Sequence, residues 1–432
     1  MPPTSIDNVR IAVIGLGYVG LPLALGLSRH FPVTGYDVSE TRISELRDGH
    51  DRTGEIKPSD LRGAALHVTA DTAELECCNV FIIAVPTPVD ADNKPDLSAA
   101  ISACRLAADV MSKGAVVILE STVYPGVTEG VCGPEMEKVS GLVCGKDFYL
   151  GYSPERINPG DREHTVDKIR KVVAGQTPVV AKLMSEIYGA MTTGGVFVAK
   201  DIKTAEAAKV IENAQRDINI AFINEVSMIF NRLGISTHDV LATARTKWNF
   251  LNFEPGLVGG HCIGIDPFYL AHVASELGYD PDVILSGRRI NDSMAGFLAQ
   301  QIDAQIRKTV SGGENARILV LGLTFKENVP DLRNSKAVDM ISTLKSLGHH
   351  VDVHDAMADQ DEAKEFFDLD LLPRLDGAEG YDCLVGAVPH AVYIAFSRRT
   401  LTSFLKPGGL IADLKGMWRH VEAGDGFHRW EL

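Results

Sequence analysis

One cysteine lies in a glycine-rich loop, where its thiol is suited to covalent chemistry. Cys262 belongs to the stretch PGLVGGHCIGIDPF (255–268), is preceded by a histidine, and lies four residues before Asp266. A thiol beside potential bases in a flexible loop can act as a nucleophile. Gly259 and Gly260 would let a ligand approach the backbone. The remaining cysteines are expected to be small buried hydrophobic residues; they are Cys77, Cys78, Cys104, Cys132, Cys144 and Cys383.

Polar residues recur on one face of a predicted long helix. Residues 204–234 contain no proline and no internal glycine, which predicts a helix of about 30 residues and about 45 Å. Lys209 and Asn213 are four residues apart and therefore share a face, and Asp217 and Asn224 continue the stripe. Periodicity alone favours a solvated face over a stripe that lines an active site.

A glycine motif near the N-terminus predicts dinucleotide binding. Gly15, Gly17 and Gly20 form G-L-G-Y-V-G directly after an apolar run. Such glycines allow a tight turn, close approach of a pyrophosphate, and close packing of helix against strand. Asp37 follows the next apolar run. A carboxylate there would accept hydrogen bonds from ribose hydroxyls and repel a 2′-phosphate, which favours NAD⁺ over NADP⁺.

Two further loops follow buried strands in this region. V-P-T-P (85–88) and S-T-V-Y-P-G (121–126) come after the fourth and fifth apolar runs. Ligands of open α/β sheets bind beyond the carboxyl ends of the strands. Thr87 and Thr122 are therefore expected near the nicotinamide half of the cofactor, although proline and threonine also simply shape loops.

A charged loop follows the first strand of the C-terminal part. The stretch GLTFKENVPDLRNS (322–335) contains Lys326, Asp331, Arg333 and Ser335. Phosphate groups recruit lysine and arginine at such positions. The alternative from composition is a charged surface loop.

Strand-like runs alternate with helix-like segments at both ends of the chain, which predicts parallel sheets. The N-terminal runs are 9–16, 31–38, 66–70, 80–86, 115–121 and 147–155, and the C-terminal runs are 317–325, 349–355, 381–388 and 408–415. We therefore expect an α/β fold with two Rossmann-like, doubly wound parallel-sheet domains joined by a central helical domain that contains one long helix. The expected boundaries are 1–203, 204–310 and 311–432.

Composition excludes several classes of protein. The net charge of −15 argues against nucleic-acid binding, which needs basic surfaces. No secretory signal or membrane-spanning apolar run is evident. The odd, scattered set of 7 cysteines is no disulfide framework and no metal-ligand cluster. We expect a reduced, cytoplasmic protein without a structural metal.

These motifs occur in one order that resembles the UDP-glucose/GDP-mannose dehydrogenase family. The order is GxGxxG with an acidic residue, V-P-T-P, S-T-V-Y-P-G, S-P-E-R, K-x-x-x-N, G-G-H-C-x-G-x-D and F-K-E-N-x-x-D-x-R-N-S. The resemblance spans nearly the whole chain. It implies NAD-dependent oxidation of a nucleotide sugar in two hydride transfers, through a thioester on Cys262.

The resemblance also implies roles for individual residues. Cys262 matches the nucleophile, and Asp266 matches a carboxylate that helps to activate water. Lys209 and Asn213 match groups that stabilise oxyanions, and the residues that position water and the reacting carbon are Thr122 and Glu155. The implied cofactor-binding residues are Gly15, Gly17, Tyr18, Val19, Gly20, Asp37, Arg42, Val85, Pro86, Thr87, Ser121, Thr122 and Arg333. The implied substrate-binding residues are Glu155, Arg156, Ile157, Asn158, Lys209, Asn213, Phe253, Gly259, Gly260 and Lys326.

Two departures from the UDP-glucose dehydrogenase pattern bear on the substrate. The chain reads P-E-R-I-N-P-G over 154–160 in place of P-E-F-L-R-E-G, and Ile265 replaces the lysine of G-G-Y-C-L-P-K-D. Any cofactor contact that this lysine makes in the family cannot be assigned to Ile265 of this chain. Residues 247–270 resemble the UDP-N-acetylhexosamine dehydrogenases of bacterial surface-polysaccharide synthesis. The expected substrate is UDP-N-acetylglucosamine or UDP-N-acetylgalactosamine, with the gluco form preferred.

Other functions remain open at this stage. UDP-glucose, UDP-ManNAc and GDP-mannose are alternative substrates. A two-electron 3-hydroxyacid dehydrogenase is a more distant alternative, but it would need neither Cys262 nor the domain at 317–415. A non-catalytic NAD sensor would not need Cys262 and Lys209. In the resembling family the long helix builds a dimer core, so we expect a homodimer.

Overall fold

The structure, a computed structural model, describes residues 1–3, 5–157, 161, 163–260, 263–310, 312–422 and 424–432. The chain divides into two compact units. The first comprises Met1–Asn213 with Phe268–Asp280, and the second comprises Ala214–Pro267 with Pro281–Leu432. Among the described residues, no helix has the length and apolar character needed to cross a membrane.

The first unit contains a sheet of eight strands among the described residues, in the order β3-β2-β1-β4-β5-β6-β7-β8. The strands are β1 (Ile11–Ile14), β2 (Val33–Tyr36), β3 (His67–Thr69), β4 (Val80–Ile83), β5 (Val116–Leu119), β6 (Tyr149–Tyr152), β7 (Lys171–Gly175) and β8 (Val196–Val198). The first six follow the Rossmann order 3-2-1-4-5-6. The pairing of β6 with β7 is antiparallel, whereas the other pairs are parallel.

Helices connect and cover these strands. They are α1 (Gly20–Ser28), α2 (Glu40–Arg47), α3 (Pro58–Arg62), α4 (Ser98–Val110), α5 (Gly133–Ser140) and α6 (Pro178–Met191), with short turns η1 (Ile6–Asn8), η2 (Thr72–Leu75) and η3 (Thr128–Cys132). Both faces of the sheet are buried because successive residues of a strand point to opposite faces. Ile11 and Val13 enter one apolar cluster, while Ala12 and Ile14 enter the other. This arrangement explains the continuous apolar runs of the sequence.

The second unit contains an all-parallel sheet of five described strands, in the order β10-β9-β11-β12-β13. The strands are β9 (Arg317–Leu321), β10 (His350–His354), β11 (Tyr381–Gly386), β12 (Leu405–Asp413) and β13 (His428–Glu431). The order matches the flavodoxin-like pattern 2-1-3-4-5. Its helices are α8 (Thr237–Ala244), α10 (Asp282–Thr309), α11 (Lys336–Ser346), α12 (Gln360–Phe367), α13 (Ala391–Ile394) and α14 (Arg398–Ser403), with the turn η4 (Gly313–Asn315).

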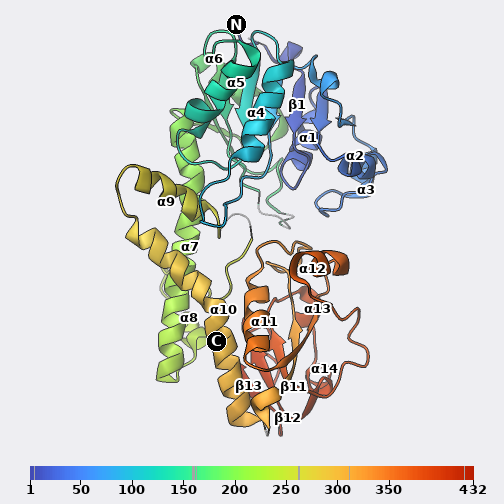
Figure 1. The fold of residues 1–432 in the computed structure, drawn as a ribbon, viewed down its shortest axis with the longest axis vertical. Helices are drawn as coiled ribbons and strands as arrows, with labels where there is room; N and C mark the ends of the chain where they lie inside the picture. The colour runs from blue at the N-terminus through green and yellow to red at the C-terminus, as the bar shows by residue number, and fades with distance from the viewer. Residues whose placement is uncertain (4, 158–160, 162, 261–262, 311, 423) are drawn as a thin grey trace. The chain divides into compact units, whose positions relative to one another are not determined.

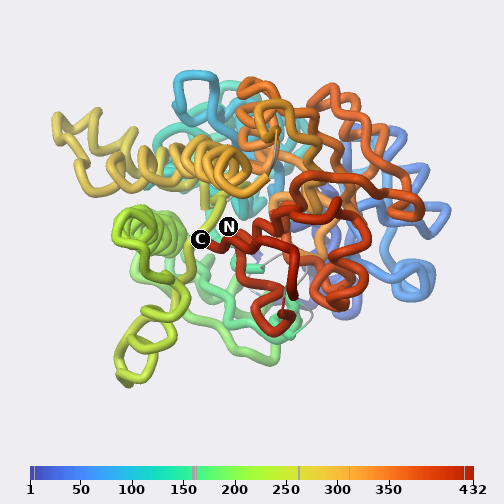
Figure 2. The backbone as a smooth tube through the Cα atoms, turned by 90° about the horizontal axis from the view of Figure 1, so that it is seen from below, coloured from blue at the N-terminus to red at the C-terminus, as the bar shows by residue number. Residues whose placement is uncertain are grey.

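The predicted long helix is α7 (Ile202–Leu233), and both α7 and α9 (Asp266–Glu276) contribute residues to both units. Residues 214–233 of α7 lie beside α10, which Figures 1 and 2 show from two directions. The contact is close because Gly287 of α10 lies against Ile218 and Ala221 of α7. The predicted fold class is confirmed, with two parallel-sheet regions and a helical region between them in the sequence. The sequence did not predict β7, β8 or β13.

Candidate active site

The glycine turn after β1 has the geometry of a dinucleotide site. Gly15 has a φ of +94°, and a side chain there would lie 2.7 Å from the Ala84 carbonyl oxygen. A side chain at Gly20 would overlap the Gly15 carbonyl oxygen. A Cβ at Gly17, by contrast, would meet nothing within 4 Å. The turn therefore leaves open space at Gly17, where a pyrophosphate would approach the backbone.

Asp37 and Arg42 support this turn from the end of β2 and from α2. Leu16 N donates to Asp37 Oδ2 at 2.9 Å, and Arg42 Nε donates to the Leu16 carbonyl oxygen at 3.0 Å. Asp37 Oδ1 also accepts from Ser39 N at 2.9 Å. Arg42 is buried and pairs with Asp51 at 2.7 Å. A carboxylate oxygen has two lone pairs, so these contacts leave Asp37 able to accept from a ribose hydroxyl.

The loops after β4 and β5 are joined to each other. Val85 N donates to Ser121 Oγ at 3.1 Å, and Ser121 Oγ donates to the Val85 carbonyl oxygen at 2.6 Å. Thr87 Oγ1 donates to the Thr122 carbonyl oxygen at 2.7 Å. Strand order reverses between β1 and β4, and ligands of such sheets bind beyond the strand ends at this switch point. The structure thus brings three predicted cofactor-binding segments to one edge of the sheet.

Glu155 is buried after β6, and both of its oxygens have partners. Glu155 Oε1 accepts from the backbone N–H groups of Arg156 and Ile157 at 2.5 and 2.6 Å. Glu155 Oε2 lies 3.1 Å from Lys171 Nζ. Lys171 also contacts Glu120 Oε2 at 3.0 Å. Lys171 therefore joins Glu155 and Glu120 in a buried charged cluster that the sequence did not predict.

Arg156, predicted to bind substrate, is bound to the long helix. Its NH2 lies 2.8 Å from Glu212 Oε1 on α7. Ile157 packs against the apolar cluster on one face of the sheet. The side chains of Arg156 and Ile157 thus point in different directions, one to a charged partner and the other to the core.

The polar stripe of α7 is buried in the first unit. Lys209 is 8% exposed and Asn213 is 5% exposed. Glu206, on the same face, accepts from Gly126 N at 2.5 Å and from Thr128 N at 2.9 Å. The interpretation of this part of the stripe as a solvated face was wrong, because all three side chains are buried and Glu206 binds the backbone of the segment after β5.

The continuation of the stripe is buried in the second unit. Asp217 and Asn224 are fully buried. Asp217 Oδ1 accepts from Arg288 NH1 at 2.6 Å and from Asn291 Nδ2 at 2.7 Å, both on α10. Asn224 Nδ2 donates to Asn291 Oδ1 at 2.8 Å. Buried polar groups that bind one another favour one alignment of the helices that carry them. Asp217 and Asn224 therefore have a structural role, which is to align α7 with α10.

Gly259 and Gly260 lie against the 322–335 loop within the second unit. A Cβ at Gly259 would lie 2.5 Å from the Asn334 carbonyl oxygen, and one at Gly260 would lie 2.7 Å from the Phe325 ring. Gly260 also has a φ of +82°. Close approach of the chain itself accounts for both glycines, whereas the sequence suggested approach of a ligand. The loop that precedes Cys262 and the loop of Lys326 are therefore neighbours.

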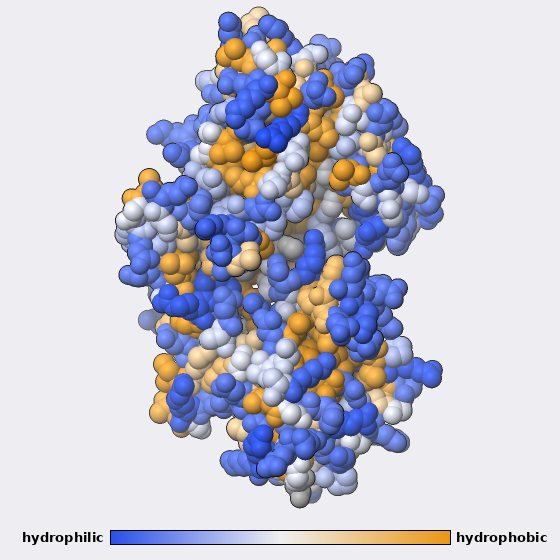
Figure 3. Space-filling model, viewed as in Figure 1, coloured by the Kyte–Doolittle hydropathy of each residue, from blue (hydrophilic) through white to orange (hydrophobic). Residues whose placement is uncertain are grey.

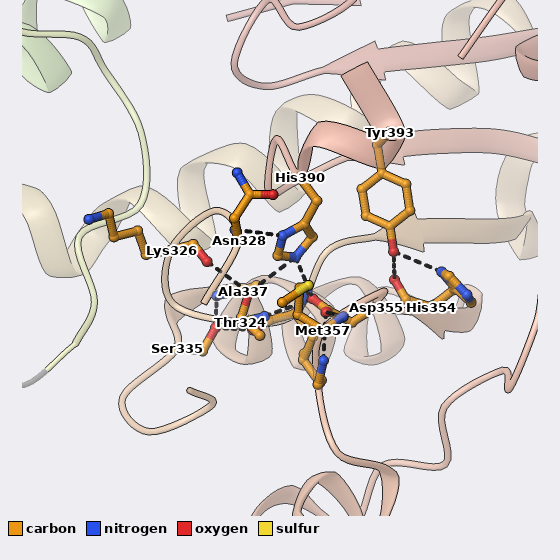
Figure 4. Close-up of polar contacts among 12 residues, drawn as sticks. Thr324, Lys326, Asn328, Ser335, Ala337, His354, Asp355, Met357, His390 and Tyr393 are labelled. Carbon is orange, nitrogen blue, oxygen red and sulfur yellow. Dashed lines mark hydrogen bonds and ion pairs between the residues drawn. The ribbon is translucent and has the colours of Figure 1, made fainter. Parts of the chain in front are cut away.

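The 322–335 loop is held by a buried histidine–aspartate pair (Figure 4). Asp355, after β10, accepts from Leu323 N at 2.5 Å, from Thr324 N at 3.0 Å and from His390 Nε2 at 3.0 Å. His390 Nδ1 accepts from Asn328 N at 2.9 Å, so Nε2 is the ring nitrogen that donates to Asp355. Despite burial, these donors and His390 hold the pKa of Asp355 far below its usual value.

Lys326 belongs to this loop, and its side chain points away from His390 in Figure 4. The strand order of the second sheet reverses between β9 and β11, which is where flavodoxin-like sheets bind ligands. Lys326 follows β9, and His390 follows β11. Arg333, further along the loop, binds Asp331 through two nitrogens at 2.9 and 2.8 Å.

Two more of the predicted residues can be located by their element and burial. Asp266 begins α9 and is buried, and Phe253 is half-buried. Cys262 and Asn158 lie outside the described residues.

Three regions of the sequence match the domains of one family. Residues 9–192 match the NAD binding domain of the UDP-glucose/GDP-mannose dehydrogenase family, residues 203–293 match its central domain, and residues 319–420 match its UDP binding domain. The chain belongs to this family. It is an NAD-dependent nucleotide-sugar dehydrogenase, as the resemblance implied.

Known relatives extend the similarity over nearly the whole dehydrogenase. It is 48% identical to Protein CapL of Staphylococcus aureus over 98% of this chain and 100% of the relative. It is 47% identical to the UDP-N-acetyl-D-glucosamine 6-dehydrogenase of Pseudomonas aeruginosa over 95% of this chain and 97% of the relative. The solved UDP-D-ManNAc dehydrogenase of Pyrococcus horikoshii superposes with a TM-score of 0.87 at 31% identity, covering 98% of this chain and 99% of that one.

The dehydrogenase also contains polar residues near the site that the sequence did not single out. Glu120 directly precedes S-T-V-Y-P-G, Lys171 begins β7, and Glu206 lies three residues before Lys209. All three are fully buried. The helical spacing of Glu206 and Lys209 could have revealed the former, but no local signal shows that Glu120 and Lys171 meet.

Proposed function

We propose that this dehydrogenase oxidises C6 of UDP-N-acetyl-D-glucosamine to the uronic acid. The observation that carries the proposal is the 47% identity, over 95% of the chain, to an enzyme with that activity. The departures at Arg156 and Ile265, together with the 247–270 stretch, agree with an N-acetylated hexose. UDP-N-acetyl-D-galactosamine, which differs only at C4, is the nearest alternative. UDP-ManNAc is favoured by the structural neighbour from Pyrococcus horikoshii.

The cofactor requirement follows from the oxidation states. The overall reaction is R–CH₂OH + 2 NAD⁺ + H₂O → R–COO⁻ + 2 NADH + 3 H⁺. NAD⁺ supplies a two-electron hydride acceptor in each half of this four-electron oxidation. The turn at Gly15, Gly17 and Gly20 fits the pyrophosphate of NAD⁺. Asp37 would bind the ribose hydroxyls, and Thr87 would contact the nicotinamide half. Arg42 and Arg333 remain predicted cofactor contacts.

Cys262 would keep the substrate bound between the two oxidations. The first oxidation gives an aldehyde, to which the thiolate adds to form a thiohemiacetal. The second oxidation leaves a thioester, and water then cleaves its C–S bond to release the carboxylate and the thiol. Asp266 would help to activate this water, and Thr122 would position it.

Lys209 and Asn213 would stabilise the oxygen anions that form during these steps. Both side chains are buried on one face of α7. A positive charge and an N–H donor stabilise a developing oxyanion strongly where water is excluded. Their burial therefore supports this role better than the solvated face that periodicity favoured.

The UDP group would bind at the switch point of the second sheet, within the family's UDP binding domain. Lys326 lies on the loop after β9, and the Asp355–His390 pair fixes the backbone of that loop. A cation on a rigid loop at a strand end is suited to a diphosphate.

The division of the chain into three domains, 1–203, 204–310 and 311–432, remains a prediction.

We further propose that the enzyme is a homodimer in the cytoplasm and serves surface-polysaccharide synthesis. Phe222, Ile229 and Leu233 of α7 are exposed, and their spacing places them on one face. Trp248 is 92% exposed. Figure 3 shows hydrophobic side chains among hydrophilic ones along the edge where Figure 1 draws α7. Exposed apolar faces of this kind mark interaction surfaces. Light scattering of the native chain and of Phe222→Glu tests the dimer, because a monomeric wild type would contradict it.

The decisive experiment is a turnover panel. The purified chain is incubated with NAD⁺ and separately with UDP-GlcNAc, UDP-GalNAc, UDP-ManNAc and UDP-glucose. We expect the highest kcat/KM for UDP-GlcNAc, two NADH per sugar, and a uronic acid product by mass spectrometry. One NADH per sugar would indicate a simple two-electron alcohol dehydrogenase. Equal or better turnover of UDP-glucose would refute the N-acetylhexosamine assignment.

A further inference from the structure

A lysine without solvent exposure joins the ends of two neighbouring strands of the first sheet. Lys171 begins β7, and its Nζ lies 3.0 Å from Glu120 Oε2 and 3.1 Å from Glu155 Oε2. Glu120 follows β5, and Glu155 follows β6. The Lys171 and Glu120 side chains are both 0% exposed. One cation thus connects the segment that leads into Thr122 with the segment that contains Glu155.

The two carboxylates are not equivalent. Glu155 accepts two backbone N–H bonds in addition to Lys171. Glu120 Oε1 has no hydrogen-bond partner among the described residues, although Tyr188 of α6 lies beside this carboxyl group. A buried charge needs both a counter-charge and hydrogen bonds to be stable. Glu155 is therefore the group that retains the negative charge.

The ionisation of the cluster agrees with this geometry. Burial raises the pKa of Glu120 to about 7, and the repulsion by Glu155 adds to the effect of burial. Burial opposes ionisation of Glu155 as well, but Lys171 and the two N–H donors lower the pKa of Glu155 overall. Burial also acts against the charge of Lys171, yet the two carboxylates raise the pKa of Lys171.

We propose that Lys171 is a positioning residue that keeps Glu155 an oriented carboxylate and aligns the Glu155 loop with the Thr122 loop. The inference rests on the proposed function in so far as Glu155 and Thr122 act there on water and the reacting carbon. Glu120 is the second anchor of the same lysine. Among the described residues, the titratable groups of this cluster are Glu120 after β5, Glu155 after β6, Lys171 at the start of β7 and Tyr188 of α6.

The main test replaces the charge while retaining the volume of the side chain. Lys171→Met leaves Glu155 without a cation, which raises the pKa of Glu155. The acidic limb of the pH profile of kcat should therefore shift to higher pH by about 1 unit or more. Glu120→Gln leaves the Lys171–Glu155 contact intact, so its acidic limb should stay within about 0.3 unit of the wild type. Lys182→Met, at an exposed position of α6, is the matched control and should match the wild type.

A second variant tests the proposal if Lys171→Met does not fold. If two buried carboxylates without a cation prevent Lys171→Met from folding, Lys171→Met/Glu120→Gln removes one of them. This double variant should fold and still show the raised acidic limb. A folded Lys171→Met or double variant with a wild-type limb would overturn the proposal and leave Lys171 with a purely structural role.

A measurement without turnover separates the inference from the proposed function. In the wild type the lowered pKa of Glu155 gives stability that is present above its unfolded pKa and is lost on acidification through its folded pKa. In Lys171→Met/Glu120→Gln, the pKa of Glu155 in the folded protein should exceed its pKa in the unfolded chain, so stability is lost as the pH rises through the folded pKa. From pH 5 to pH 8 the Tm of this variant should therefore fall more steeply than the Tm of the wild type. Adding Glu155→Gln should abolish this difference in slope. Equal slopes in the double variant and the wild type would overturn the inference, even if no UDP-sugar were oxidised.

Discussion

Asn224 of α7 binds Gly256 through both atoms of its side-chain amide. Gly256 N donates to Asn224 Oδ1 at 2.7 Å, and Asn224 Nδ2 donates to the Gly256 carbonyl oxygen at 3.0 Å. Lys415 Nζ donates to the neighbouring Pro255 carbonyl oxygen at 3.0 Å. The loop that leads to Cys262 is thus fixed at its start by the long helix and by the segment after β12.

Asn224→Leu should disturb this loop more than it disturbs the fold. It leaves the Gly256 N–H and carbonyl buried without their side-chain partner, at a cost of about 1–3 kcal/mol. We expect kcat to fall by about tenfold or more, because catalytic groups lose activity when they are misplaced by about 1 Å. Asn219→Ala, at a half-buried position of the same helix, is the control for urea unfolding and steady-state kinetics. Wild-type kcat in Asn224→Leu would contradict the prediction.

Asp37→Asn should weaken the preference for NAD⁺. The amide oxygen of asparagine can still accept from Leu16 N, so the glycine turn should survive, while the charge that repels a 2′-phosphate is lost. The ratio of kcat/KM for NAD⁺ to that for NADP⁺ should be high in the wild type and at least about tenfold lower in the variant, a change of about 1.4 kcal/mol. Comparable kcat/KM values for both cofactors in the wild type would refute the role of Asp37.

Lys326→Ala should weaken binding of the nucleotide sugar selectively. Loss of a charged contact to a diphosphate costs about 1.5–3 kcal/mol, so KM for the UDP-sugar should rise by about tenfold or more. KM for NAD⁺ should change little. Lys336→Ala, a surface lysine at the start of α11, serves as the control. A bound UDP remote from Lys326 in a crystal structure would contradict this assignment.

Cys262→Ser should separate the two halves of the reaction. Serine is a poorer nucleophile at neutral pH, and an oxygen ester is hydrolysed less readily than a thioester. Mass spectrometry after incubation with substrate and NAD⁺ should therefore detect a covalent ester. Cys262→Ala should form no acid, although the first oxidation could continue slowly. Near-wild-type acid formation by the alanine variant would exclude Cys262 as the nucleophile.

Asp355→Asn should reduce stability at neutral pH but much less in acid. Because the pKa of Asp355 is lowered in the folded protein, its contribution is present above the unfolded pKa of about 4 and is lost as pH falls through the folded pKa. The free energy of unfolding at pH 7 should fall by about 1–3 kcal/mol, and the difference from the wild type should narrow toward pH 3. Asp370→Asn, at an exposed position, is the control for urea unfolding at both pH values. A difference that is independent of pH would contradict this reading.

Features that depend on a local pattern of residues could be predicted from the sequence. Continuous apolar runs predicted β1, β4 and β5, because strands covered on both faces contain few polar residues. The absence of proline and internal glycine predicted α7 to within two residues at its start. Gly15 and Gly20 were recognisable because the turn and the packing that they permit require glycine wherever this motif occurs. The edge strands β7, β8 and β13 were missed, since short runs that include charged or exposed residues lack a clear period.

Which polar residues are buried depends on contacts between segments that are distant in the sequence. Lys209 and Asn224 follow a spacing that by itself favours a solvated face, yet both are buried in the folded chain. Gly260 requires glycine because Phe325 packs against it. Lys171 lies 51 residues from Glu120 and 16 from Glu155, and these distances in sequence carry no information about contact. Lys171, Glu120 and Glu155 become partners only when the sheet places β5, β6 and β7 side by side. A buried charge is stable only beside a charge of opposite sign, so the three side chains then stabilise one another.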